Sequence, residues 1–308
     1  MSMKVIRTQL AAKIETAEGT LETLAGADAL LAANVQFKPT PEMGERPNVT
    51  ASLSPFALVP GARSATMEFD VEIKAVTAGT APALGKLLRA CGFGETIVAL
   101  TSATYLPAST AVPSISIGAF MDGVIKRIWG ARGDFSIKLE SGKPGWIHFV
   151  FTGADFSVVD GAMLTTGVTY EATVPPALLS AALTIDSYAA LVGLLDIRGG
   201  NKVTLRKDIN TASGFKSAVI SGRAPALTLD PEFVTVATYD WYGKLRSGNL
   251  GALSVALLGA AGNRCTITAP KVQYANINPA DRDGWRTLGI DCALARNAGD
   301  DELSIAFT

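Results

Sequence analysis

Residues 120–151 carry the pattern that most constrains the fold: short runs of alternating apolar and polar residues, separated by tight turns. Asp122-Gly123 is a dipeptide that commonly turns the chain between the two strands of a hairpin. Residues 134–140 alternate with the period of two that is typical of a strand with one face in water. Lys143-Pro144-Gly145 indicates a second turn, after which residues 146–151 run back. This stretch therefore predicts a series of antiparallel strands.

A similar stretch occurs later in the chain, at residues 261–290. The interval between Gly123 and Gly145 equals that between Gly262 and Gly284, and a tryptophan follows the second glycine of each pair. Further echoes keep the same order along the chain: Phe135, Phe149 and Phe151 with Tyr274, Leu288 and Ile290; Gly85-Lys86-Leu87 with Gly243-Lys244-Leu245; and Arg63, Met67, Phe69, Asp70 and Glu72 with Arg223, Leu227, Leu229, Asp230 and Glu232. Because order and spacing are nearly constant, the sequence predicts an internal duplication.

The length of the chain agrees with two units, because 308 residues exceed the size of one typical hydrophobic core. We predict a first domain at residues 1–175, which opens with an N-terminal arm at residues 1–28, and a second domain at residues 176–308. Each domain is expected to be mainly β, a β-sandwich or barrel with one short flanking helix and one long loop.

The helices are expected at residues 79–93 and 235–246, and the long loops at residues 38–65 and 199–226. The first loop has several prolines and little periodicity, and a loop of that length in a compact domain is normally either disordered or functional. Its apolar residues argue against disorder and predict that it packs on another subunit; they are Val49, Leu53, Phe56, Leu58 and Val59.

The composition favours a protein that buries part of its surface in an assembly. Hydrophobic residues make up 48% of the chain and charged residues only 18%, which is low for a soluble monomer. No apolar run reaches the ~18 residues that a transmembrane helix needs. The net charge of −1 is spread evenly, so the sequence has no basic patch of the kind that grips DNA.

Patterns typical of catalysis or metal binding are missing from the sequence. His148 is the single histidine, and its place inside a predicted strand favours a structural role. The cysteines at 91, 265 and 292 are far apart, which favours reduced, buried thiols over disulfides or a zinc site. No serine, cysteine or aspartate lies in a nucleophile-elbow context. We therefore predict neither an enzyme nor a bound cofactor, and residues 1–19 lack the apolar run of a signal peptide.

Acidic residues recur on one face of a predicted strand. Glu68, Asp70 and Glu72 alternate with apolar residues, and Asp230 and Glu232 occur at the corresponding places of the second copy. An ordinary solvated face explains this pattern. A second interpretation is a channel wall that repels a polyanion, so that nucleic acid passes without binding.

Four stretches of the chain resemble the major tail tube proteins of long-tailed bacteriophages, in the variety with two tube-type domains in one chain. They are VPGARSATMEFDVEIKAVTAGTAPALGKLLRACGF, PASTAVPSISIGAFMDGVIKRIWGARGDFSIKLESGKPGWIHFVFTG, APKVQYANINPADRDGWRTLGIDCALA and the C-terminal GDDELSIAFT. The resemblance covers nearly the whole chain. It lies in ordered agreement over this length rather than in one sharp motif.

The resemblance implies homotrimeric rings with pseudo-sixfold symmetry, in which strands of neighbouring domains join into one continuous inner barrel. Such rings stack head-to-tail into the hollow tail tube, through which phage DNA passes during ejection without sequence-specific binding. The expected partners are further copies of the chain, the tail terminator, and the tail-tip and tape-measure proteins, with no membrane insertion. The expected location is the virion tail, after synthesis and assembly in the cytoplasm of the host bacterium.

The same resemblance assigns roles to two groups of residues. The candidates for the lumen are the acidic residues Glu68, Asp70, Glu72, Asp230 and Glu232. The candidates for the loops that stack one ring on the next are Val49, Leu53, Phe56, Leu58, Arg63, Phe215 and Arg223.

Two other functions stay open at this point. One is the tube protein of a contractile injection or secretion system, which has the same architecture but needs a face that binds a sheath. The other is a carbohydrate- or receptor-binding β-sandwich of a tail tip. That function predicts a cluster of exposed aromatic residues, whereas the four tryptophans are scattered along the chain; they are Trp129, Trp146, Trp241 and Trp285.

Overall fold

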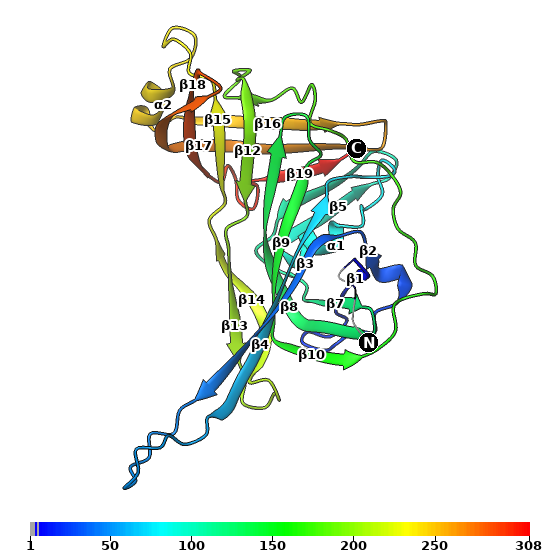
Figure 1. The fold of residues 1–308 in the computed structure, drawn as a ribbon. Helices are drawn as coiled ribbons and strands as arrows, with labels where there is room; N and C mark the ends of the chain where they lie inside the picture. Colours follow the sequence, from blue (N-terminus) through cyan, green and yellow to red (C-terminus); the bar gives the residue numbers. More distant parts are fainter. Residues whose placement is uncertain (1–3, 5) are drawn as a thin grey trace.

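The computed structural model describes residue 4 and residues 6–308 (Figure 1). This part of the chain consists largely of antiparallel strands, as the alternating pattern predicts. Two short α-helices, α1 (Gly85–Ala90) and α2 (Trp241–Ser247), and one 3-10 turn, η1 (Gly26–Asp28), accompany the strands. The predicted mainly β fold is thereby confirmed.

A central sheet of eight strands runs through both halves of the chain. In order of pairing, its strands are β3 (Ala33–Gly44), β4 (Val59–Glu72), β9 (Trp146–Gly153), β8 (Val124–Glu140), β12 (Val192–Arg198), β15 (Ala226–Pro231), β18 (Trp285–Leu294) and β17 (Arg264–Arg282). The first four strands come from the first half and the last four from the second. The halves meet where β8 pairs with β12, with Ile137 opposite Ile197.

Two further layers cover one face of the central sheet, because β8 and β17 are long enough to enter a second sheet. The first part of β8 pairs with β7 (Ile115–Met121) and β10 (Asp155–Asp160), and β7 pairs with β1 (Thr8–Ile14), which also pairs with β2 (Ala29–Leu30). The first part of β17 pairs with β16 (Leu250–Leu258) and β19 (Ser304–Phe307). β11 (Thr184–Ile185) extends this layer beside β16, and β6 (Ser102–Pro107) and β5 (Phe93–Val98) extend it beside β19.

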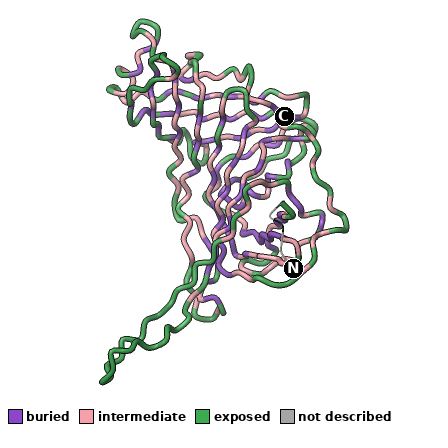
Figure 2. The backbone as a smooth tube through the Cα atoms, in the orientation of Figure 1, coloured by how far each residue is buried: buried purple, intermediate pink, exposed green. Residues whose placement is uncertain are grey.

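The hydrophobic core lies between the central sheet and these outer layers (Figure 2). Apolar residues at every second position of the central strands point into it, and Phe69, Phe149 and Phe151 form a fully buried aromatic cluster. The buried interior is continuous across the two halves, because β19 near the C-terminus pairs with β6 of the first half. β19 is thus a second link between the halves.

The N-terminal arm predicted at residues 1–28 contains an integral strand. Leu10, Ala11 and Ala12 of β1 are buried, because β1 lies between β2 and β7 with both faces covered. Residues 1–3 and 5 of the predicted arm lie outside the described residues. Both predicted helices exist but are shorter than expected, since residues 79–84 and 235–240 form turns and irregular segments that lead into α1 and α2.

The two regions predicted as long loops are β-hairpins instead. The first is the distal part of β3 and β4 with its connecting tip, residues 39–64, and we call it the first hairpin. The second is formed by β13 (Asn201–Lys207) and β14 (Phe215–Arg223), and we call it the second hairpin. Backbone hydrogen bonds between the two arms give each region regular structure. The prolines and glycines interrupt the alternation of apolar and polar residues from which strands are predicted.

Several sequence echoes fall on matching elements, and one group is displaced. Gly85-Lys86-Leu87 begins α1 and Gly243-Lys244-Leu245 lies in α2. The strand pairings place Phe69 opposite Phe149 and Leu229 opposite Ile290, so Ile290 rather than Leu288 lies where Phe149 does. The displacement arises because a two-residue turn joins β17 to β18, whereas a longer connection joins β8 to β9.

Candidate functional site: the polar face and the open edges of the central sheet

The face of the central sheet opposite the core is polar. Alternation along β4 places Glu68, Asp70 and Glu72 on this face, while Met67, Phe69 and Val71 point into the core. The pairings carry the same face through β9, β8 and β12 to Asp230 of β15, and Glu232 follows just beyond the end of that strand. The structure therefore brings the five acidic residues singled out in the sequence to one face of one sheet.

Basic and amide groups accompany the carboxylates of the first half. His148 of β9 places Nδ1 2.6 Å from Oδ1 of Asp70, and Asn34 donates from Nδ2 to the other oxygen at 2.6 Å. Lys74 lies 3.1 Å from Glu72. Sequence reasoning assigned His148 only a structural role, but its side chain lies on the polar face and is 43% exposed. The alternation of His148 with Ile147 and Phe149 was the signal that could have placed it there.

The carboxylates of the second half are held by one arginine. Arg282 of β17 donates to Asp230 at 2.7 Å and lies 3.3 Å from Glu232. Asp230 also accepts hydrogen bonds from the backbone N–H groups of Gly193 and Leu194 at 2.8 and 2.7 Å. The face is therefore a mixed surface in which Asp70, Glu72, Asp230 and Glu232 contact nearby basic side chains, rather than an uninterrupted acidic strip.

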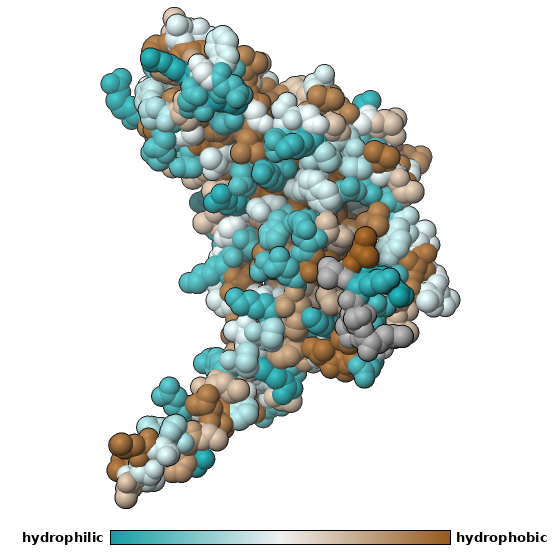
Figure 3. All heavy atoms as spheres, viewed as in Figure 1, coloured by the Kyte–Doolittle hydropathy of each residue, from teal (hydrophilic) through white to brown (hydrophobic). Residues whose placement is uncertain are grey.

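A groove of about 470 Å³ lies on this face, beside the junction of the two halves. Hydrophilic side chains gather down the middle of the view in Figure 3, where β3, β9 and β12 lie in Figure 1. The groove is lined by polar residues of five strands, among them Asn34, Asp70, Ser136, Lys138, His148 and Asp196. Among the described residues, no group of three or more His, Cys, Asp or Glu is placed to hold a metal ion.

The central sheet ends in two strands with an unpaired edge. β3 pairs with β4 alone among the described strands, and the segment of β17 from Asn276 to Arg282 pairs with β18 alone. Proline, which cannot donate to a ladder, occurs on both edges, as Pro39 and Pro41 of β3 and Pro279 of β17. An open strand edge presents free backbone donors and acceptors and is a ready site for pairing with another chain.

The first hairpin projects from the body of the protein and is exposed along both arms (Figures 1 and 2). Its tip carries hydrophobic side chains in Figure 3. The proposed stacking residues there are exposed, Val49 and Leu53 almost completely, Phe56 and Leu58 by 40% and 53%. Arg63 at the base donates from Nε to Asp155 at 2.9 Å.

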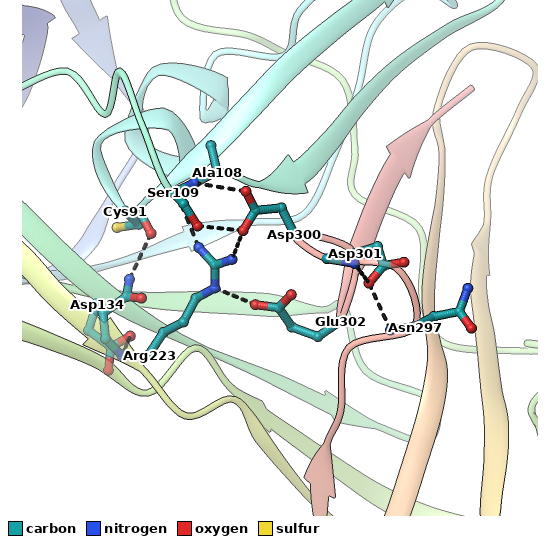
Figure 4. A network of polar contacts seen from close by, with 11 residues as sticks. Cys91, Ala108, Ser109, Asp134, Arg223, Asn297, Asp300, Asp301 and Glu302 are labelled. Carbon is teal, nitrogen blue, oxygen red and sulfur yellow. Dashed lines mark hydrogen bonds and ion pairs between the residues drawn. The ribbon is translucent and has the colours of Figure 1, made fainter.

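The second hairpin packs against its own chain, so its two proposed stacking residues have intramolecular roles. Phe215 is buried. Arg223 joins a polar network in which its guanidinium contacts Asp300 and Glu302 and donates to the carbonyl of Ala108 at 3.1 Å (Figure 4). A hydrogen bond from Ser109, together with Arg223, lowers the pKa of Asp300 below its usual range, despite partial desolvation.

The four tryptophans do not gather into one exposed cluster, although Phe233 and Tyr242, each about 40% exposed, form an aromatic pair with ring centroids 6.0 Å apart. Trp241 packs with Tyr188, Tyr239 and Tyr274 in the core of the second half, and it is 1% exposed. Trp285, at the start of β18, is 68% exposed. No helix in the described part of the chain is both long and apolar enough to cross a lipid bilayer.

Comparison with known proteins agrees with this architecture. The family model described as phage tail tube protein matches residues 6–307, and so covers both halves of the chain and every strand of the central sheet. A search of curated proteins finds no match. Since the family model spans nearly the whole sequence, the chain belongs to the phage tail tube proteins, the structural proteins of the tail tube of a bacteriophage virion.

Proposed function

We propose that three copies of this chain close into a ring through the open edges of their central sheets, and that stacked rings form the tube that conducts phage DNA into the host. The observation that carries the proposal is the pairing of β8 with β12. This pairing joins the two halves within one chain, and the edges of β3 and β17 are left at the two ends of the same sheet. Pairing β3 of one copy with β17 of the next repeats the internal joint between chains.

Each half contributes four strands to the sheet, so three chains of eight strands would form a barrel with pseudo-sixfold symmetry. This symmetry requires the two halves, residues 1–175 and 176–308, to be duplicated domains. An ion pair at the base of each hairpin supports the duplication: Arg63 with Asp155 in the first half, and Arg223 with Glu302 in the second. Closing the sheet into a barrel removes both exposed edges.

In the proposed barrel the polar face lines the lumen, because the opposite face is already covered by the outer layers. Glu68, Asp70, Glu72, Asp230 and Glu232 then lie on the channel wall. Lys74 and Arg282 offset part of the negative charge of these carboxylates. A hydrated wall with few free cations offers DNA little counterion-release energy, so DNA passes without being held.

Both hairpins leave the central sheet at the same end of the strands that carry them, so we assign the stacking of rings to that end. The first hairpin, with its exposed apolar residues Val49, Leu53, Phe56 and Leu58, is the proposed element of the surface that meets the adjacent ring. Contacts of this head-to-tail kind generate an open filament. We place the tube in a long-tailed, siphovirus-type tail assembled in the host cytoplasm, with the terminator, tail-tip and tape-measure proteins at its ends and in its lumen.

The ring can be tested by disulfide cross-linking across the proposed joint. In the internal joint Asp196 of β12 lies opposite Lys138 of β8. The matching strand pairings align Asp196 with Gln36 of β3, and Lys138 with Ala280 of β17. Opposite residues in an antiparallel pair have Cβ atoms about 4.5–5.5 Å apart, which is near the separation that a disulfide needs.

We therefore expect the double variant Gln36→Cys, Ala280→Cys to form covalent dimers and trimers on oxidation, and no larger product. Each single-cysteine variant is the control and should give no trimer; the native thiols at 91, 265 and 292 are buried. End-on electron micrographs should show threefold rings with six similar lobes. Covalent hexamers, or assembled tubes without any cross-link, would show that this joint is wrong.

A further inference from the structure

We propose that the first hairpin, residues 39–64, docks on the second half of the neighbouring chain in the same ring. There it takes the place that the second hairpin takes on the first half of its own chain. The inference rests on the ring proposed above and adds to it a second contact between neighbouring chains.

The two hairpins have the same relation to the central sheet. The first continues from β3 and returns through β4, and the second continues from β12 and returns through β15, with equal numbers of residues between the corresponding points Ala33 and Glu72, and Gly193 and Glu232. Each has an arginine at its base that pairs with a carboxylate of its own half. They are therefore equivalent elements, and we compare what each one touches.

The arms of the second hairpin are held on the first half by polar contacts. Arg132 of β8 donates to the carbonyl of Ala218 and to Glu18, which also accepts from Ser217 at 2.9 Å. Asn201 donates from Nδ2 to the carbonyls of Cys91 and Gly133 at 2.7 and 3.1 Å. Phe215, Ser217 and Ala218 are buried as a result.

The docking site on the first half has two fixed parts. One is the turn after α1, where Ile220 lies against Gly92. The other is the middle of β8, where Asp134 accepts from the backbone N–H of Asn201 at 3.0 Å. The tip of the second hairpin then reaches the base of the first, where the N–H of Arg63 donates to the carbonyl of Ser213 at 3.0 Å.

The first hairpin has equivalent arms but leaves them exposed in the single chain. Every residue from Pro39 to Gly61 is exposed, including Met43, Leu58 and Val59, each by about half. Exposed apolar residues on a projecting β-ribbon favour a protein partner. We propose that the partner is a second copy of this chain. The second hairpin lies beside the first half of its own chain, and ring closure places the second half of the next chain in the equivalent position beside the first hairpin.

The receiving surface on the neighbouring chain follows from the same equivalence. The turn after α1 corresponds to the turn after α2, at Gly248–Leu250, since both helices end at a glycine with positive φ and pack near β8 and β17 respectively. The middle of β8 corresponds to β17 near Ala275 and Asn276, which are exposed. Leu250 is 46% exposed and no strand of the described chain covers it on that side.

If every hairpin tip meets the base of the next hairpin, six hairpins form a closed collar at one end of the ring. Leu53 of the first hairpin corresponds to Ser213 of the second, so it is expected beside Gly222 and Arg223 of the neighbouring chain. The outward surface of such a collar is then the surface that meets the next ring.

The test is a cross-link in the double variant Pro60→Cys, Leu250→Cys. Pro60 corresponds to Ile220, and Leu250 lies in the turn that corresponds to the one that Ile220 contacts at Gly92. Purified assembled protein is treated with a short bismaleimide and the products are sized on a denaturing gel. Docking within the ring predicts dimers and trimers and no larger product, because three head-to-tail links close a circle. The matched control replaces Leu250→Cys by Leu258→Cys, at the far end of the same strand and also 46% exposed, and should give no trimer.

The outcomes separate this inference from the ring itself. A ladder that continues beyond the trimer would mean that the first hairpin reaches an adjacent ring, and the inference would fail. Absence of the Pro60–Leu250 product in protein whose Gln36–Ala280 disulfide forms trimers would also overturn it, while the proposed ring would stand. Absence of both products would count against the ring.

Discussion

The two hairpins of this protein are built alike and buried differently. The second hairpin, β13–β14, packs on the first half of its own chain, with Ala218 fully buried and held by Arg132. The first hairpin projects from the body with both arms exposed. Within the described central sheet the two halves meet once, where β8 pairs with β12, so only one of the two hairpins has a neighbouring half beside it in the same chain. The comparison teaches that equivalent hairpins can be covered in one half and open in the other, and in the proposed ring a neighbouring chain covers the open one.

The edges of the central sheet repeat this asymmetry. β8 and β12 satisfy each other's backbone groups within the chain, whereas β3 and the last part of β17 are open. Val35 and Phe37 of β3 are only partly buried, while the corresponding Leu195 and Ile197 of β12 are fully covered. Equivalent strands are therefore paired on both edges and buried in one place, and open on one edge and partly exposed in the other.

The largest effect is expected from removing the tip of the first hairpin. Replacing residues 45–58 by Asn-Gly, a dipeptide that favours a tight hairpin turn, should abolish tube assembly and leave the melting temperature of the unassembled protein unchanged. The reason is that the deleted residues are exposed in the single chain. Electron microscopy and circular dichroism measure the two outcomes. Normal tubes from the deleted protein would break the comparison.

Replacing one phenylalanine in each hairpin by alanine should lower the free energy of unfolding by different amounts. Phe215→Ala is expected to lower the free energy of unfolding by about 3 kcal/mol, because a buried aromatic side chain leaves a cavity. Phe56→Ala should change it by less than about 0.5 kcal/mol, because Phe56 is 40% exposed in the single chain. Urea unfolding of unassembled protein measures both values, and equal losses would contradict the difference in burial.

Substitution of the arginine at the base of each hairpin should also destabilise the protein more in the second hairpin than in the first, by a smaller difference than the phenylalanines show. Arg223→Met removes a partner from Glu302, whose side chain is 8% exposed, and should cost about 2 kcal/mol. Arg63→Met removes the ion pair with Asp155. Because the Arg63 side chain is 46% exposed, the free energy of unfolding should fall by only about 0.5–1 kcal/mol. The same unfolding assay provides the readout. A larger loss for Arg63→Met would reverse the comparison.

The smallest effect is expected in the pH dependence. Burial would raise the pKa of Glu18, but hydrogen bonds from Arg132 and Ser217 outweigh it and lower the pKa below the ordinary value of 4.5. A lowered carboxyl pKa stabilises the fold at pH above the ordinary value, and this stability is lost as the pH falls through the lowered pKa.

Glu18→Gln should therefore flatten the loss of stability below about pH 4.5. Thermal melts of unassembled protein across pH 3–6 measure the slope. Glu45→Gln on the exposed first hairpin is the control and is expected to keep the slope of the parent chain. A slope that Glu18→Gln leaves unaltered would mean that Glu18 does not hold the second hairpin.

Sequence reasoning predicted the strands better than their lengths. Alternation located β4 and β8, and the helices expected at residues 79–93 and 235–246 overlap α1 and α2, because residue periodicity and turn chemistry are local properties. The sequence predicts loops at residues 38–65 and 199–226, because prolines and glycines interrupt the alternation that a β-hairpin otherwise has. The role of His148 was missed because its partner Asp70 is distant in the chain.

Which face of each strand is polar was determined by the sequence itself. The placement of Glu68, Asp70 and Glu72 on one side of β4 needs only the two-residue period of a strand, and so does the opposite placement of Met67 and Phe69. The tertiary structure decided which strands lie side by side: that β8 joins β12, that β19 joins β6, and that one hairpin is covered while the other projects. Pairing depends on contacts between distant segments and on how many neighbours a chain can supply, and no local pattern carries that information.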